Sequence, residues 1–247
     1  MIIRSDETVD VPTSGGGSMR IHLFRPAIPG RFPGVLLFSE IYQVTDPIRR
    51  LAAMIAGQGY VVGVPEVYHE YEPAGTVLHY DQAGTDRGNF LKFHKPVAAY
   101  DEDARIGLEF LRGHEACTGK LATMGVCLGG HLAYRAALNP IVSAAACFYA
   151  TDIHSRTLGA GKSDDSLARM AELKAETMFV WGRQDPHVPF EGRLAIRARL
   201  EEVGARYEWH EVNAAHAFLR DEGPRYDPAL FLQAIDWTLR LFHRTLY

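Results

Sequence analysis

The chain has 247 residues, of which 47% are hydrophobic and 23% are charged, a composition that argues against a collagen, a coiled coil or a disordered protein. With 26 basic and 30 acidic side chains, the formal net charge is −4. This balance supplies neither the basic surface that nucleic acids require nor a polybasic membrane signal. We therefore expect no nucleic-acid partner and no membrane partner.

The cysteine content and the N-terminal sequence indicate in which cellular compartment the protein resides. Three cysteines are too few for a disulfide framework, and none of them forms a CxxC pair. The first residues lack the apolar core of a signal peptide, and no apolar run reaches the roughly 18–20 residues that cross a bilayer. These features predict a cytoplasmic protein with reduced thiols.

The chain opens with β character and then alternates between strands and helices. Stretches at 8–11 and 19–24 flank the glycine-rich segment 14–18 and predict an N-terminal hairpin. In chain order, we then expect a strand at 33–38, a helix from 46 to about 56, a strand at 60–65, a helix at 97–111, a strand at 121–126, a helix at 129–138, strands at 144–149 and 177–181, a helix at 190–203, a strand at 207–212 and a helix from about 228 to 242.

This alternation predicts an α/β fold: one domain over residues 1–247, with a mostly parallel twisted sheet covered by helices on both faces. Two segments carry no clear periodicity. Residues 66–96 are read as a long functional or mobile loop. Residues 151–176 are read either as a lid or as a solvated loop.

The segment MGVCLGG at 124–130 carries the strongest chemical signal. It follows a predicted buried strand and precedes a predicted helix, as in a Gly-x-nucleophile-x-Gly elbow with cysteine in place of serine. Such a turn lifts the Cys127 sulfur above the end of the strand, and the helix N-terminus favours negative charge there. The N–H of Leu128 would then donate to an oxyanion. The alternative is a chance pattern around a buried structural cysteine.

Two further residues follow later strands in the order expected of a catalytic triad. Asp185 comes just after the strand at 177–181, and His216 comes just after the strand at 207–212. Ligands and catalytic groups gather at such carboxyl ends in parallel sheets. Taken singly, Asp185 is also a common turn or capping residue. Together with Cys127, the three residues predict a nucleophile, an acid and a base.

The sequence resembles the dienelactone hydrolase (carboxymethylenebutenolidase) family, which has the α/β-hydrolase fold. The resemblance covers nearly the whole chain and rests on SEIY at 39–42, GVCLGG at 125–130, GRQDPHVP at 182–189 and HAFLR at 216–220. Cysteine at the elbow, combined with glutamate after the third strand, makes it specific. It implies a cysteine-dependent hydrolase of small lactones or esters that forms a thioester intermediate.

The resemblance also implies roles for individual residues. Cys127 would be the nucleophile, His216 its base and Asp185 the group that orients the imidazole. Further roles follow for a glutamate that helps to ionise the cysteine (Glu40), for oxyanion donors (the N–H groups of Ile41 and Leu128) and for substrate-binding side chains (Arg220, Arg87 and Tyr42). Arg87 is the loosest of these matches, because residues 66–96 diverge from the best-known members.

The remaining reactive residues receive structural interpretations. The spacing of His69, His79 and His94 matches no standard metal-ligand pattern, so we expect no metal and no cofactor. Cys117 is expected to be a partly exposed thiol in a polar connection, and Cys147 a packed core residue. Trp181, Phe218 and Tyr42 would line the cleft or, alternatively, pack in the core.

Alternative functions stay open at this stage. One is a broader carboxylesterase that needs no substrate carboxylate. Another is a small-molecule binding protein that kept the fold and lost turnover. A redox-responsive thiol is a third reading, although no resolving cysteine lies nearby in the sequence. We expect a monomer or a small homo-oligomer whose partner is a small lactone or ester.

Overall fold

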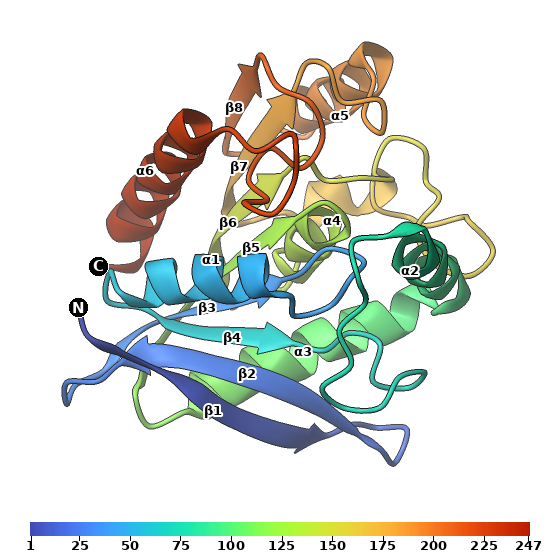
Figure 1. The fold of residues 1–247 in the computed structure, drawn as a ribbon. Coiled ribbons are helices and arrows are strands. Elements are labelled where there is room, and N and C mark those ends of the chain that lie inside the picture. Colours follow the sequence, from blue (N-terminus) through green and yellow to red (C-terminus); the bar gives the residue numbers. More distant parts are fainter.

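A computed structural model describes residues 1–247, which form one continuous eight-stranded sheet with helices on both faces (Figure 1). The strands are β1 (Ile3–Pro12), β2 (Ser18–Pro26), β3 (Phe32–Phe38), β4 (Val61–Pro65), β5 (Cys117–Val126), β6 (Val142–Phe148), β7 (Glu176–Gly182) and β8 (Tyr207–Val212). The helices are α1 (Asp46–Ala56), α2 (Gln82–His94), α3 (Val97–Gly113), α4 (Leu128–Ala136), α5 (Phe190–Glu202) and α6 (Pro228–Leu246), with a short 3₁₀ turn, η1, at Ala168–Glu172.

The order of strands in the sheet is β1-β2-β4-β3-β5-β6-β7-β8. The β1–β2 hairpin is antiparallel and pairs antiparallel with β4 at one edge, and the strands from β4 to β8 run parallel to one another. This arrangement confirms the predicted fold class, including the N-terminal hairpin. It also brings the carboxyl ends of β3, β5, β6, β7 and β8 to one edge of the sheet.

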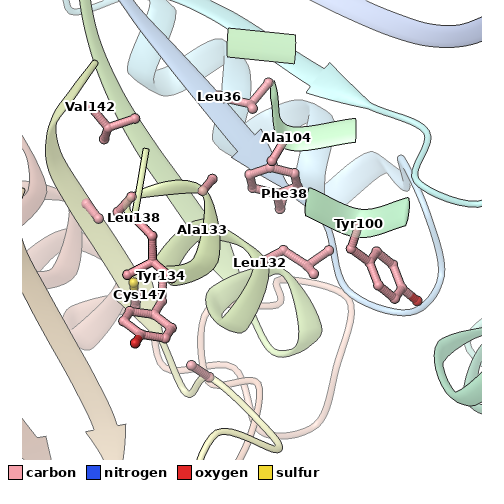
Figure 2. Packing of buried hydrophobic residues seen from close by; sticks show 14 of the residues in the cluster. Leu36, Phe38, Tyr100, Ala104, Leu132, Ala133, Tyr134, Leu138, Val142 and Cys147 are labelled. Carbon is pink, nitrogen blue, oxygen red and sulfur yellow. The ribbon is translucent and has the colours of Figure 1, made fainter. Parts of the chain in front are cut away.

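The core lies in two layers because successive strand residues point to opposite faces. Val35 and Leu37 of β3 join the layer under α1 and α6, whereas Leu36 and Phe38 join the layer under α3 and α4. Figure 2 shows the second layer, where Leu132 and Ala133 of α4 lie close to strand residues. Both layers extend over the parallel strands from β3 to β7, whereas the residues of β8 are only half-buried.

The C-terminal helix α6 covers one end of the first layer. One stripe of it is buried, including Phe231, Ala234 and Phe242, and Asp227 caps its first turn by accepting from the N–H groups of Ala229 and Leu230. The opposite side of α6 carries mostly polar side chains, with Leu232 exposed among them. No helix in the structure is both long and apolar enough to cross a membrane.

The reading of residues 66–96 as one long loop is wrong for its second half, where α2 forms. Its buried face consists of Gly84, Gly88, Leu91 and Lys92, so the apolar periodicity that marks most helices is missing. The glycines are required by close packing. A Cβ at residue 84 would lie 2.0 Å from the carbonyl oxygen of His79, and one at residue 88 would lie 2.6 Å from that of Ile41.

Two further expectations need correction. Residues 151–176 do not form a solvated loop, since Ile153, Leu158 and Ser166 are fully buried and Asp164 accepts from the N–H groups of Leu158 and Ser166. Cys117 is not a partly exposed thiol: it is fully buried at the start of β5. The polar residues around it misled the prediction, because the cysteine points into the core while its neighbours face solvent. Cys147 is buried in β6, as predicted.

Candidate active site

The turn between β5 and α4 holds Cys127 in an unusual backbone conformation. Its φ of 59° and ψ of −122° lie outside the regions that non-glycine residues normally adopt. Three neighbouring glycines make the turn possible. A Cβ at Gly125 would lie 1.9 Å from the carbonyl oxygen of Gly129, and a Cβ at Gly129 would lie 2.1 Å from that of Phe38. Local strain of this kind is concentrated at functional sites.

The imidazole of His216 and the carboxylate of Asp185 meet beyond the ends of β8 and β7. His216 Nδ1 donates to Asp185 Oδ2 at 2.7 Å, and Asp185 Oδ1 accepts from the N–H of His187 at 2.8 Å. Both side chains are almost completely buried. The ring of Tyr149 packs edge-on against His216 with ring centroids 5.0 Å apart.

The charge environment of His216 favours the imidazolium. Burial alone lowers the pKa of His216, but the electrostatic interaction with Cys127 and the hydrogen bonds of His216 with Asp185 and Cys127 outweigh that effect and raise the pKa to about 10. The imidazole therefore lies between the sulfur and the carboxylate. The three residues named in order from the sequence meet at one place in the fold.

Glu40 and Arg220 form a second polar group beside the first. Glu40 is buried two residues after β3, and its Oε2 lies 3.8 Å from Arg220 Nη1 and accepts from the Tyr80 hydroxyl at 3.1 Å. Burial raises the pKa of Glu40, although the positive charges of Arg220 and His216 act in the opposite direction. The Arg220 guanidinium also lies 4.4 Å from the ring centroid of Tyr80, and its buried Nε has no hydrogen-bond partner.

A pocket of about 270 Å³ opens above these side chains. Cys127, His216, Glu40 and Arg220 all line it. Ile41 also lines it, and the backbone N–H of Ile41 donates to no carbonyl. The N–H of Leu128, at the first position of α4, is unpaired as well, whereas its side chain is buried in the core. An oxyanion hole requires two such unpaired N–H groups; Leu128 directly follows Cys127, and Ile41 lines the same pocket.

Of the predicted substrate-binding residues, Tyr42 and Arg220 line the pocket and Arg87 does not. Arg87 is exposed and paired with Glu72 at 2.6 Å, because it lies on the outer side of α2. Arg225 lines the pocket instead, at a position five residues after Arg220 in the same connection. Trp181 and Phe218 are fully buried in the core rather than in the cleft.

Several pocket residues were missed by sequence reasoning. Thr85, Asn89 and Lys92 come from α2, which was not recognised as a helix, and Thr151 and His187 come from the connections after β6 and β7. Their only sequence signal is position: Thr151 and His187 follow strands that end at the same edge as Cys127.

One group of side chains has the composition of a metal site but holds a lysine. His69, Glu70 and Asp103 bring their ligand atoms within 4.8 Å of one another. The fully buried ammonium of Lys95 lies among them, donating to Glu70 at 2.6 Å and to Asp103 at 2.6 Å. His69 Nε2 completes the group at 2.9 Å from Asp103. A cation of the protein itself thus fills the space that a metal would take.

The sequence model of the dienelactone hydrolase family matches residues 19–246. The chain belongs to this family. A Saccharomyces cerevisiae relative, named provisionally as a carboxymethylenebutenolidase, is 44% identical over 96% of this chain and 90% of its own length. A carboxymethylenebutenolidase of a Pseudomonas species is 28% identical over 96% of this chain and 95% of its own.

Solved structures of family members and their neighbours have the same fold. A Klebsiella pneumoniae protein, titled provisionally a dienelactone hydrolase, superposes with a TM-score of 0.82 at 21% identity, covering 99% of this chain and all of its own. A dienelactone hydrolase-like promiscuous phosphotriesterase from metagenomic libraries gives 0.80 at 18% identity and covers both chains fully. As a dienelactone hydrolase family member, the protein is a hydrolase that acts on esters or lactones.

Proposed function

We propose that the protein hydrolyses small anionic lactones or esters through a thioester on Cys127, with His216 as base and Asp185 as the group that orients it. The observation that carries the proposal is the 2.7 Å contact between His216 and Asp185, beside Cys127 and at the floor of a pocket. Nucleophile, base and orienting group in mutual reach are the requirement for covalent catalysis of acyl transfer.

The first step is attack of the Cys127 thiolate on the substrate carbonyl carbon. The carbonyl oxygen becomes an oxyanion that accepts from the N–H groups of Ile41 and Leu128. Collapse of this intermediate breaks the bond to the leaving oxygen and leaves a thioester, and the leaving group takes the proton of the His216 imidazolium directly or through solvent, so that His216 becomes neutral. An enolate or a phenolate leaves readily, so a sulfur nucleophile suits activated esters better than amides.

The second step is hydrolysis of the thioester. Neutral His216 removes a proton from water, the hydroxide adds to the thioester carbonyl, and collapse releases the carboxylic acid and the thiolate. Asp185 fixes the tautomer in which Nε2 faces the reacting atoms, since its Oδ2 accepts the Nδ1 proton. The imidazolium that results is the state that the environment of His216 favours.

Recognition of a substrate carboxylate is assigned to Arg220, with Arg225 as the second cation in place of Arg87. Arg220 is held against Glu40 and the ring of Tyr80, and its side chain lines the pocket. Arg225 makes no ion pair in the structure. Glu40 lies beside both Arg220 and His216, and we assign to its carboxylate the stabilisation of the positive charges of these two residues.

The test is to follow p-nitrophenyl acetate by rapid-mixing kinetics and intact-protein mass spectrometry. The native protein should gain one acetyl group on the peptide that contains Cys127, and the adduct should decay at the rate of turnover. Cys127→Ala should lose both the adduct and the turnover, while Cys117→Ala, a matched change at another thiol, should retain both.

Three outcomes would count against the proposal. Turnover by Cys127→Ala would remove the nucleophile from the mechanism. An adduct that forms but never decays would favour a binding protein on this fold. Equal kcat/KM for neutral and carboxylate-bearing esters would favour the broader carboxylesterase. The cytoplasmic location and the state of monomer or small homo-oligomer stay predictions from the sequence.

A further inference from the structure

One face of α2 presents a polar stripe to the pocket. Thr85, Asn89 and Lys92 are spaced by four and three residues, so their side chains lie on the same side of the helix. The Thr85 hydroxyl is already paired with the Tyr42 hydroxyl at 2.8 Å. Asn89 and Lys92 are therefore the members of this stripe that remain open to a ligand.

Lys92 is held in place by Asp152. Its ammonium donates to Asp152 Oδ2 at 3.0 Å and to Oδ1 at 3.3 Å. The carboxylate is fixed in turn by hydroxyl donors, from Thr151 at 2.6 Å and from Thr157 at 2.9 Å. Asp152 itself has a positive φ of 68°, an energetically costly conformation for a non-glycine residue. A strained aspartate with four hydrogen-bond contacts holds one ammonium at the pocket wall.

The donors of Lys92 are not all used by the protein. An ammonium has three N–H donors, and Asp152 is the only oxygen partner of Lys92. The residue is 8% exposed, so bulk water does not surround the ammonium. Its other neighbour is the ring of Phe93, 4.2 Å from the ammonium to the ring centroid, which stabilises the charge but accepts no directed oxygen contact. Buried donors without an acceptor at a pocket wall indicate a ligand oxygen.

Two other donors line the same pocket. The side-chain amide of Asn89 makes no hydrogen bond within the protein and lines the pocket. The ring of His187 also lines it, edge-on to His216 with centroids 4.5 Å apart, and has no hydrogen-bond partner of its own. Burial and the positive charge of His216 lower the pKa of His187, so at neutral pH its ring is uncharged and offers one N–H.

We propose that Asn89, Lys92 and His187 form a second subsite of the pocket, which binds a carboxylate of the substrate other than the one held by Arg220. The substrates that fit are small lactones or esters with two free carboxylates. The inference rests on the proposed function, because it assigns a substrate class to the same pocket.

Arg220 and Lys92 belong to separate polar groups, which supports two subsites rather than one. Arg220 is paired with Glu40 beside Tyr80, whereas Lys92 is paired with Asp152 on the connection after β6. Asp152 neutralises much of the charge of Lys92, so the subsite binds its ligand through directed N–H donors rather than through net charge. A carboxylate is the group that accepts from several donors at once. The volume of about 270 Å³ accommodates a compact ligand.

The test compares binding of glutarate and tricarballylate by isothermal titration calorimetry. Glutarate supplies one carboxylate for the reacting position and one for Arg220, and tricarballylate adds a third for the second subsite. The native protein should bind tricarballylate at least about tenfold more tightly than glutarate, the scale of one charge-assisted hydrogen bond. Lys92→Met should abolish that difference and leave glutarate binding unchanged.

Two further variants keep the test decisive. Lys162→Met removes an exposed lysine that also lies over Phe93, at 4.5 Å, and should leave both affinities unchanged. Asn89→Ala leaves the Lys92–Asp152 pair intact and should weaken tricarballylate alone, by about threefold to tenfold. It replaces Lys92→Met should that variant fail to fold.

The outcomes separate the subsite from the function. Equal affinity of the native protein for the two acids would overturn the subsite, as would a preference that survives both Lys92→Met and Asn89→Ala. Hydrolysis of p-nitrophenyl acetate, measured on the same preparations, tests Cys127 independently. Turnover without acid discrimination refutes only the subsite, and acid discrimination without Cys127-dependent turnover refutes only the proposed chemistry.

Discussion

Replacing Asp185 with asparagine should disable the base without disturbing the fold. The two oxygens of Asp185 have different partners: Oδ2 accepts from His216 Nδ1, and Oδ1 accepts from the N–H of His187. An amide has one oxygen and one NH₂, so it can satisfy only one of these donors. If the oxygen keeps the bond to His187, the NH₂ faces Nδ1 and places the imidazole proton on Nε2. His216 then turns a donor toward Cys127 and cannot accept its proton.

The opposite orientation of the amide is less favourable, because its NH₂ would face the buried N–H of His187 and break a bond of 2.8 Å. The wrong tautomer should therefore dominate. Loss of the orienting carboxylate in a triad costs about 10⁴-fold in kcat, which corresponds to about 5 kcal/mol in the activation free energy. The unfolding temperature should change little, since the amide has the shape of the carboxylate.

The assay is steady-state hydrolysis of an aryl ester together with thermal unfolding. Asp236→Asn is the matched control, because Asp236 is an exposed carboxylate paired with Arg240 on α6. It should leave the rate unchanged. A loss below tenfold for Asp185→Asn would mean that Asp185 does not set the tautomer of His216. A comparable loss in Asp236→Asn would mean that the effect is not local.

Two other changes test the pocket and its support. Arg220→Met should raise KM at least about tenfold for a carboxylate-bearing ester and leave a neutral aryl acetate unaffected; equal effects on both esters would contradict the assigned carboxylate contact. Lys95→Met should lower the free energy of unfolding by about 3–5 kcal/mol, because Asp103 loses the buried cation that neutralises it, while the exposed Lys174→Met should stay within about 0.5 kcal/mol in a urea titration. A cost below about 1 kcal/mol for Lys95→Met would show that the group is not held together by charge.

The fold was largely predictable because the central strands are apolar runs of ordinary length. The run at 33–38 became β3, which is buried along most of its length. The predicted strand at 207–212 matches β8, although all six of its residues are only half-buried. Cys127, Asp185 and His216 could be placed together because each follows a strand, and a parallel sheet sends all strand ends to one edge.

The failures have a common physical reason, which is that tertiary packing decided the outcome. Helix α2 was missed because only one of its four buried positions, Leu91, is a large apolar residue, whereas Gly84 and Gly88 pack closely against backbone carbonyls and Lys92 pairs with a carboxylate. The pocket wall that α2 builds was missed with it. Arg87 was chosen by alignment, but its position on the helix turns it toward Glu72 and solvent.

The packing of the nucleophile turn has a consequence for recognising inactive descendants of such a protein. Gly125, Gly129 and Gly130 each face a backbone carbonyl so closely that a single added carbon would overlap it. Loss of chemistry would not relax that constraint, so a relative that only binds its ligand would keep the three glycines. The packing of the turn does not constrain the thiol of Cys127 in this way, so the cysteine can be replaced while the glycines stay. A genome search that relies on the glycine pattern alone will therefore count inactive relatives as enzymes.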